Sequence, residues 1–157
     1  SGSMLTMNAI IAADQVLVPV AADPLALDAT HRLVTIVRHI CARLQLDVEL
    51  ELLLTRNHRR RRICREVRGA LQARYGAALL PVAIHEGVAL AACGGSGRTV
   101  FETARTSRAA ADYEAFLDIH MARDARRRAA CATAPFEAAD RTTTPGATRA
   151  ETGALQR

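Results

Sequence analysis

The chain has 157 residues, about half of them apolar, and a formal net charge of +5. This length and apolar content are enough for one compact hydrophobic core and too little for two. The chain contains no apolar run of the roughly 18 to 20 residues that a membrane-spanning helix needs, and no secretory signal follows Met4. We therefore expect a soluble, cytoplasmic protein without a membrane partner. All 21 basic residues are arginine, so functions that need a phosphate-binding lysine in this chain are excluded.

The first half of the sequence alternates between helix and strand patterns. We interpret residues 1–3 as a tag remnant, residues 4–13 as the end of a helix and residues 15–20 as a buried strand. From Asp28, a frequent helix N-cap, apolar residues recur at helical spacing up to residue 44. Alternation over residues 48–54 predicts a strand near a sheet edge, because its two glutamates need water on one face.

The second half continues the alternation. Residues 59–75 have helical spacing, Gly76 is the expected C-cap, and residues 79–84 form a third predicted strand. A glycine-rich turn at residues 94–97 leads to Ser107, which is expected to cap a last helix. The pattern predicts an α/β fold, a mostly parallel sheet of β-α-β units with flanking helices, over residues 4–128. Periodicity then stops, and residues 129–157 are expected to be a disordered tail.

A dense arginine cluster is the most conspicuous feature of the chain. Seven arginines lie within residues 56–68, at a predicted strand-to-helix junction. Such a cluster can bind phosphates through bidentate hydrogen bonds and counterion release, without reading base sequence. The alternative is a solvated basic face without a ligand. The residues predicted to contact DNA are Arg59, Arg60, Arg61, Arg62 and Arg65.

No catalytic or metal-binding motif emerges elsewhere. Residues 93–99 resemble a phosphate loop poorly, because Ala92 replaces the first glycine, Arg98 replaces the lysine and residues 100–102 do not predict a helix. We interpret them as an ordinary turn. The spacings of the four cysteines and five histidines predict neither a zinc site nor a disulfide framework. His85 is the histidine of most interest, because it directly follows a predicted strand, where ligands bind in open α/β sheets.

Three stretches, in this order, resemble the C-terminal half of ParA-type partition ATPases, which belong to the deviant-Walker P-loop class. The first resembles the helix and strand after the Walker B aspartate, the second the strand before a basic turn, and the third the closing loop and last helix. They read LTMNAIIAADQVLVPV (residues 5–20), LLLTR (52–56), and IHEGVALA, SGRTVFE and SRAAADY (84–91, 96–102 and 107–113).

This resemblance implies an incomplete P-loop-type sheet, because the Walker A loop and its two lysines have no counterpart in the sequence. Members of the family bind ATP and Mg²⁺, dimerise over ATP, coat the nucleoid through arginines and are stimulated by a ParB-type partner. Arg60 matches a DNA-contacting arginine of the basic turn, whereas a second such arginine is replaced by Ala89. The nucleotide base edge would fall at Thr55, Arg56, Ile84 and His85.

We therefore expect a fragment of a ParA-like partition protein that binds nonspecific DNA, or a partner, at the nucleoid without autonomous ATP hydrolysis. No cofactor is expected for this chain alone. One alternative is half of a split ATPase, completed by a polypeptide that carries a Walker A loop. Another is a decayed, inactive gene product. An uncovered apolar sheet edge favours self-association or a completing partner.

Overall fold

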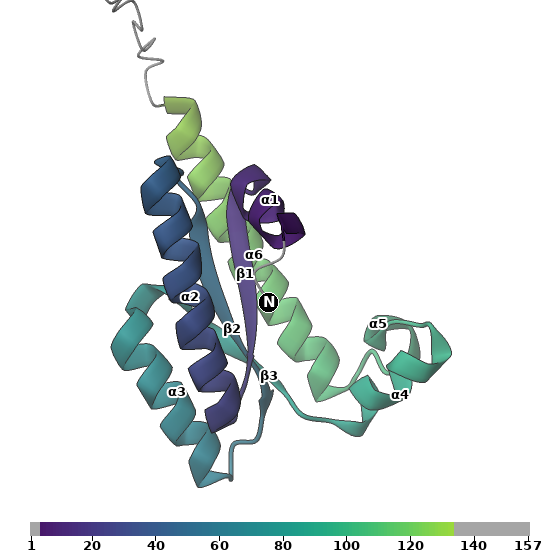
Figure 1. Cartoon of the computed structure of the whole chain (residues 1–157). Helices are drawn as coiled ribbons and strands as arrows, with labels where there is room; N and C mark the ends of the chain where they lie inside the picture. Colours follow the sequence, from purple (N-terminus) through teal and green to yellow (C-terminus); the bar gives the residue numbers. More distant parts are fainter. Residues whose placement is uncertain (1–3, 134–157) are drawn as a thin grey trace, which may run out of the picture.

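Three parallel strands form the centre of the computed structural model, which describes residues 4–133 (Figure 1). They lie in the order β1-β2-β3, so consecutive strands are neighbours joined by helical crossovers. The predicted α/β fold with a parallel sheet and flanking helices is confirmed. The elements are α1 (Met4–Ala12), β1 (Gln15–Ala21), α2 (Pro24–Leu44), β2 (Glu49–Asn57), α3 (Arg62–Tyr75), the short 3-10 helix η1 (Gly76–Ala78), β3 (Leu79–His85), α4 (Val88–Ser96), α5 (Val100–Thr103) and α6 (Arg108–Thr133).

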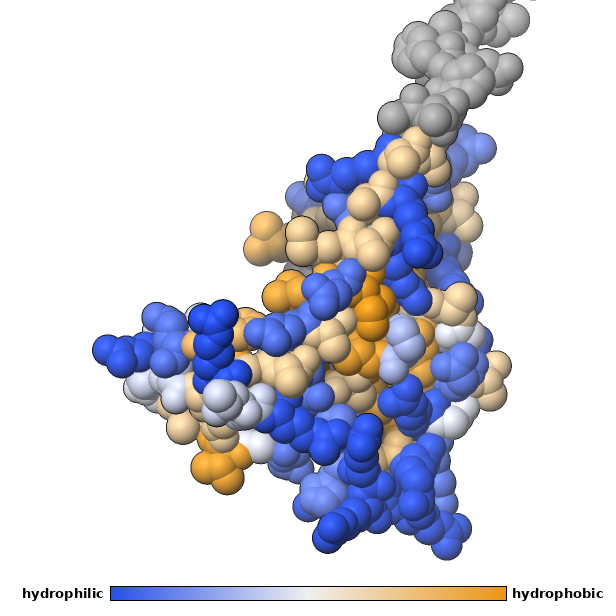
Figure 2. Space-filling model, turned by 180° about the vertical axis from the view of Figure 1, so that it is seen from behind, coloured by the Kyte–Doolittle hydropathy of each residue, from blue (hydrophilic) through white to orange (hydrophobic). Residues whose placement is uncertain are grey.

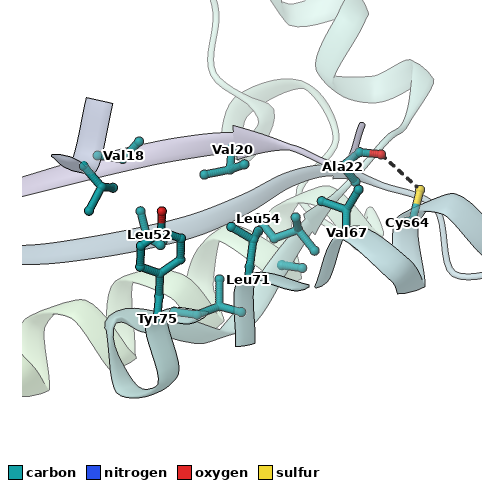
Figure 3. Close-up of a cluster of buried hydrophobic side chains, with 12 residues drawn as sticks. Val18, Val20, Ala22, Leu52, Leu54, Cys64, Val67, Leu71 and Tyr75 are labelled. Carbon is teal, nitrogen blue, oxygen red and sulfur yellow. Dashed lines mark hydrogen bonds between the residues drawn. The ribbon is translucent and has the colours of Figure 1, made fainter. Parts of the chain in front are cut away.

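Helices α2 and α3 cover one face of the sheet. Leu52 and Leu54 of β2 point into this layer and are fully buried against Leu71 of α3 (Figure 3). Burial of each such leucine contributes about 1.5–3 kcal/mol relative to leaving it exposed. This cluster is the largest part of the hydrophobic core, and it fixes α3 beside the ends of β2 and β3.

Helix α6 packs on the opposite face. Successive side chains of a strand point to opposite faces, so Leu53 lies on this side together with Leu80 and Ile84 of β3, and all three pack near Phe116 of α6. An uninterrupted apolar run such as residues 52–54 is what a strand covered on both faces requires.

A polar feature of β2 differs from the prediction. The strand is central rather than at an edge, and Glu51 is fully buried instead of reaching water. The Glu51 carboxylate accepts hydrogen bonds from His120 Nδ1 at 2.7 Å and from Arg123 at 3.3 Å, both on α6. Two paired donors replace the water that the prediction assumed.

Two helices begin at positions other than those predicted. Helix α2 begins at Pro24, because the side chain of Asp23 accepts a hydrogen bond from the backbone N–H of Ala26 at 2.8 Å. A proline at the first helical position supports this start, since its φ already suits the helix. Helix α3 begins at Arg62 rather than at residue 59, because residues 58–61 form a turn.

The glycine-rich segment is helical rather than a turn. Gly94 and Gly95 lie within α4, and the chain leaves the helix only at Gly97, whose φ of +64° lies in the left-handed region. Helix α4 is held by Cys93, which packs against Val100 and the start of α6. Residues 100–102, which were not expected to be helical, begin the single turn α5.

The last helix is longer than predicted. Ser107 Oγ accepts a hydrogen bond from the backbone N–H of Ala110 at 3.3 Å, as expected of a cap, but α6 continues through Thr133, past the predicted boundary at residue 128. The rest of the predicted tail, residues 134–157, and the predicted tag remnant, residues 1–3, lie outside the described residues. Within residues 4–133, none of the helices combines the length and the hydropathy needed to cross a bilayer.

Candidate functional site

The candidate site lies where β2 and β3 end, at the carboxyl edge of the parallel sheet. Asn57 at the end of β2 pairs with His85 at the end of β3, and the backbone N–H of Glu86 donates to the Asn57 carbonyl at 3.1 Å. This pairing brings the two halves of the predicted base edge together. Thr55 and Arg56 precede Asn57, whereas the side chain of Ile84 is 3% exposed and belongs to the core beneath α6.

The end of β2 is irregular in its backbone. The pairing with β3 shifts register between Leu54 and Asn57, and Arg56 between them has a φ of +50°. A non-glycine residue rarely adopts this conformation, which costs of order 1 kcal/mol or more and persists only when its surroundings hold it. Here the Arg56 side chain lies 3.6 Å from the Glu86 carboxylate. The irregularity directs the chain out of the sheet and into the arginine-rich turn.

The structure separates the five predicted DNA-contacting arginines into two groups. Arg61 lies 3.7 Å from Glu86, and Arg62 donates to Glu66 at 2.6 Å. That hydrogen bond, with the charge of Glu66, raises the pKa of Arg62 above its usual value. The other three, which we call the arginine patch, are exposed, and their side chains make no ion pair or hydrogen bond within residues 4–133; they are Arg59, Arg60 and Arg65.

The arginine patch borders two cavities. The edge cavity, of about 560 Å³, lies between α3, β3 and α6; it is lined by Asn57, Arg59, Cys64, Arg65, Arg68, Pro81, Val82, Ala83, His85, Arg108 and Asp112. The turn cavity, of about 500 Å³, is lined by Asn57, His58, Arg59, Arg60, His85, Glu86 and Arg108. Figure 2 shows hydrophilic residues gathered at the end of the molecule where β2 runs into α3.

A hydrogen-bond network fixes the wall that the two cavities share. His85 Nδ1 and the His85 backbone N–H both lie within hydrogen-bond distance of Asp112 Oδ2, at 2.8 and 2.9 Å. The other ring nitrogen, Nε2, lies 3.2 Å from both the Asn57 amide nitrogen and the Arg108 guanidinium. Because both of these groups are donors, Nε2 accepts and the ring proton sits on Nδ1. Through Nε2, His85 contacts Arg108 at the cavity wall.

Sequence reasoning identified His85 but missed the residues that act with it. Asn57, Arg108 and Asp112 are separated from His85 by 23 to 28 positions. A weak signal existed, because Arg108 and Asp112 are four residues apart in the first turns of the predicted last helix and so share a face. Nothing in the sequence indicated that this face meets the end of the third strand.

The side chains at the site are of the kind that suits an anion. Arginine donors converge on both cavities, and no group of three His, Cys, Asp or Glu side chains in residues 4–133 is placed to hold a metal ion. The glycine-rich segment offers no competing phosphate site. The start of α5 is already occupied, because the Glu102 carboxylate accepts from the backbone N–H of Thr99 at 2.8 Å, and this bond lowers the pKa of Glu102.

Comparison with known proteins gives relatives of similar sequence. The chain is 31% identical over 112 residues to "Uncharacterized protein" from Pseudomonas putida strain KT2440 and to "Uncharacterized protein in gidB 3'region" from Pseudomonas putida. Each match covers 71% of this chain and 43% of the relative, so the chain spans less than half the length of the curated relatives it matches. No protein-family model matches the chain.

Proposed function

We propose that this chain binds duplex DNA without sequence preference, through phosphate contacts from the arginine patch. The observation that carries the proposal is the state of that patch, since Arg59, Arg60 and Arg65 are exposed and have no acidic partner within residues 4–133. An unpaired guanidinium keeps its donors for a ligand, and phosphate oxygens match its geometry. The five arginines predicted from sequence are thus reduced to three principal contacts.

The scarcity of aromatic side chains at the site favours duplex over single-stranded DNA as the ligand. Aromatic residues make up 3% of the chain, and neither cavity beside the patch is lined by Phe, Tyr or Trp. Binding of single strands relies on aromatic side chains on which bases stack. Binding to the phosphate backbone of a duplex needs only cationic donors, and that is what this surface supplies.

Resemblance to ParA-type partition proteins supports the same proposal. In that comparison Arg60 corresponds to a DNA-contacting arginine of the basic turn, and in the structure it is exposed in the turn between β2 and α3. We extend the proposal accordingly to a ParA-like, nucleoid-binding role without autonomous ATP hydrolysis. A lysine-free chain lacks the phosphate-binding lysines on which ATP hydrolysis in that family depends.

The proposal is tested by titrating a fluorescein-labelled nonspecific duplex with the full chain at two salt concentrations, with and without MgATP. We expect the affinity for the duplex to fall steeply as the salt concentration rises. The affinity should not depend on base sequence and should not change when MgATP is added. A single strand of the same length should bind more weakly. Binding that required MgATP, or that did not respond to salt, would contradict the proposal.

A second candidate function is half of a P-loop ATPase, completed by a polypeptide that carries a lysine-containing phosphate loop. The observation that favours it is β1, an edge strand of the parallel sheet on which Leu17 is 37% exposed. In this case the chain alone would not hydrolyse MgATP, and addition of the completing polypeptide would restore turnover. A mixture without turnover, together with salt-sensitive DNA binding by the chain alone, favours the first candidate.

A further inference from the structure

The residues that line the edge cavity carry an excess of positive charge. The proposed DNA binding by the arginine patch does not account for this excess. Four arginines line the cavity, namely Arg59, Arg65, Arg68 and Arg108, against a single carboxylate, Asp112. That carboxylate is already engaged, because Oδ2 is shared by the backbone and ring N–H groups of His85. A concave surface with excess positive charge attracts a small anion more strongly than an open one does.

Two of these arginines make a hydrogen bond within the fold. Arg68 of α3 donates to the backbone carbonyl of Pro81 at 3.1 Å, and Arg108 of α6 lies 3.2 Å from His85 Nε2. Each guanidinium has five N–H donors, so most of them remain free for a ligand. Side chains that are positioned before the ligand arrives lose less conformational entropy on binding.

Arg108 differs from Arg61 and Arg62 in the kind of side chain that it contacts. Arg61 and Arg62 each form an ion pair with a carboxylate. Arg108 instead lies 3.2 Å from His85 Nε2, and the other ring nitrogen of His85 lies 2.8 Å from Asp112 Oδ2. His85 thereby contacts Arg108 without a direct ion pair to a carboxylate, so most of the guanidinium donors stay available to an anion.

We propose that the edge cavity is a binding site for a phosphate monoester group or inorganic phosphate, with Arg108 as its main ligand and His85 as the residue that positions Arg108. A phosphate dianion presents three oxygens, two of which can form a bidentate pair with the Arg108 guanidinium. Internal phosphodiesters of DNA carry a single charge and are flanked on both sides, so they suit the exposed patch better. This site goes beyond the proposed DNA binding and does not depend on it.

Titration of the full-length chain with inorganic phosphate by isothermal calorimetry, at low salt, tests the proposal. Wild-type protein should bind phosphate saturably, and Arg108→Gln should weaken the affinity about tenfold or more, because one charge-assisted pair is lost. Arg105→Gln is the matched control. It removes the same charge three residues away, from an exposed side chain that lines neither cavity, and should leave the affinity within about twofold of wild type.

Two substitutions of His85 test its role in positioning Arg108 without changing any arginine. His85→Ala should weaken phosphate binding, whereas His85→Gln, whose side-chain oxygen can still accept from Arg108, should restore part of it. Circular dichroism of each variant checks folding, and Arg108→Gln keeps the test decisive if the His85 variants unfold. Absence of saturable phosphate binding by the wild type would overturn the proposal, as would equal losses in Arg105→Gln and Arg108→Gln.

Competition then separates the two sources of a phosphate monoester. A short DNA with a 5′-phosphate, compared with its 5′-hydroxyl counterpart, should displace phosphate better if the ligand is a DNA end. Equal competition by the two supports a free small-molecule phosphate. Arg60→Gln distinguishes this site from the patch, since Arg60 does not line the edge cavity; it should weaken duplex binding and leave phosphate affinity unchanged.

Discussion

At the scale of single residues, buried charge in this protein is organised around contacts between α6 and the sheet. The Glu51 carboxylate has no exposed surface, yet His120 and Arg123, which bind it, are about a quarter exposed. Taking a carboxylate out of water costs several kcal/mol unless its partners and hydrogen bonds compensate. Loss of Arg123 would therefore leave an unpaired charge in the protein interior, whereas loss of Glu51 would leave partners that water can reach.

We predict that Arg123→Met is more damaging than Glu51→Leu. Arg123→Met leaves a fully buried carboxylate without its charged donor, so the free energy of unfolding should fall by about 3 kcal/mol. Glu51→Leu removes the buried charge itself, and its partners can hydrate, so the fall should be about 1 kcal/mol. Urea denaturation of both variants measures the difference. A larger fall in the free energy of unfolding for Glu51→Leu than for Arg123→Met would contradict this account of the buried carboxylate.

At the scale of elements, helix α4 shows how packing overrides local preference. Glycine in a helix interior costs about 1 kcal/mol relative to alanine, and α4 contains Gly94 and Gly95. The helix nevertheless forms, because Cys93 is buried against Val100 and the small residues at the start of α6. A Cβ added at Gly94 or Gly95 would meet no heavy atom within 4 Å apart from those of its chain neighbours and of the α4 backbone.

This geometry gives a test of whether the segment is a helix or the turn predicted from sequence. Gly95→Ala should raise the melting temperature, corresponding to a gain of about 0.5–1 kcal/mol. Gly97→Ala should lower it, because Gly97 has a φ of +64°. Differential scanning fluorimetry of the two variants is sufficient. Destabilisation by Gly95→Ala would indicate that residue 95 lies in a turn after all.

The elements that sequence predicted well are those whose pattern is local. Apolar periodicity located the three strands and the cores of α2, α3 and α6, and their alternation gave the parallel sheet. The start of α2 was misplaced because both Asp23 and Asp28 suit an N-cap, and only Asp23 makes the bond. On α6, the apolar residues Leu117 and Met121 are exposed, so hydropathy alone does not define the buried face of this helix.

The same limit applies to the candidate site. The arginine cluster was visible because it is contiguous in sequence, and His85 because it follows a strand. The acidic partners of Arg61 and Arg62, and the pairing of His85 with Asp112, depend on tertiary contacts. On α6 those contacts turn charged residues toward the sheet, where hydropathy alone predicts apolar ones. Sequence therefore located the surface but not which of its arginines are free.

At the scale of the whole molecule, the two arginine-rich segments differ in how far their side chains are paired within the fold. In the run at residues 123–128, Arg123 binds Glu51, and Arg127 and Arg128 bind Asp124. The hydrogen bond from Arg127 lowers the pKa of Asp124, so the two ion pairs of Asp124 persist at neutral pH and are lost only as the pH falls through that lowered pKa. The run is thus largely engaged within the fold, whereas the patch at the other end of α6 is not.

The measurement that tests the central claim most directly is the salt dependence of duplex binding by the triple variant Arg59→Gln/Arg60→Gln/Arg65→Gln. The matched control is Arg32→Gln/Arg43→Gln/Arg105→Gln, which removes the same charge from exposed side chains that make no ion pair or hydrogen bond within residues 4–133. If the patch contacts phosphates, the slope of log K against log salt should fall by about 2 to 3 in the patch variant and by less than about 1 in the control. Equal slopes in the two variants would mean that the protein responds only to its net charge, and the arginine patch would not be a DNA-binding site.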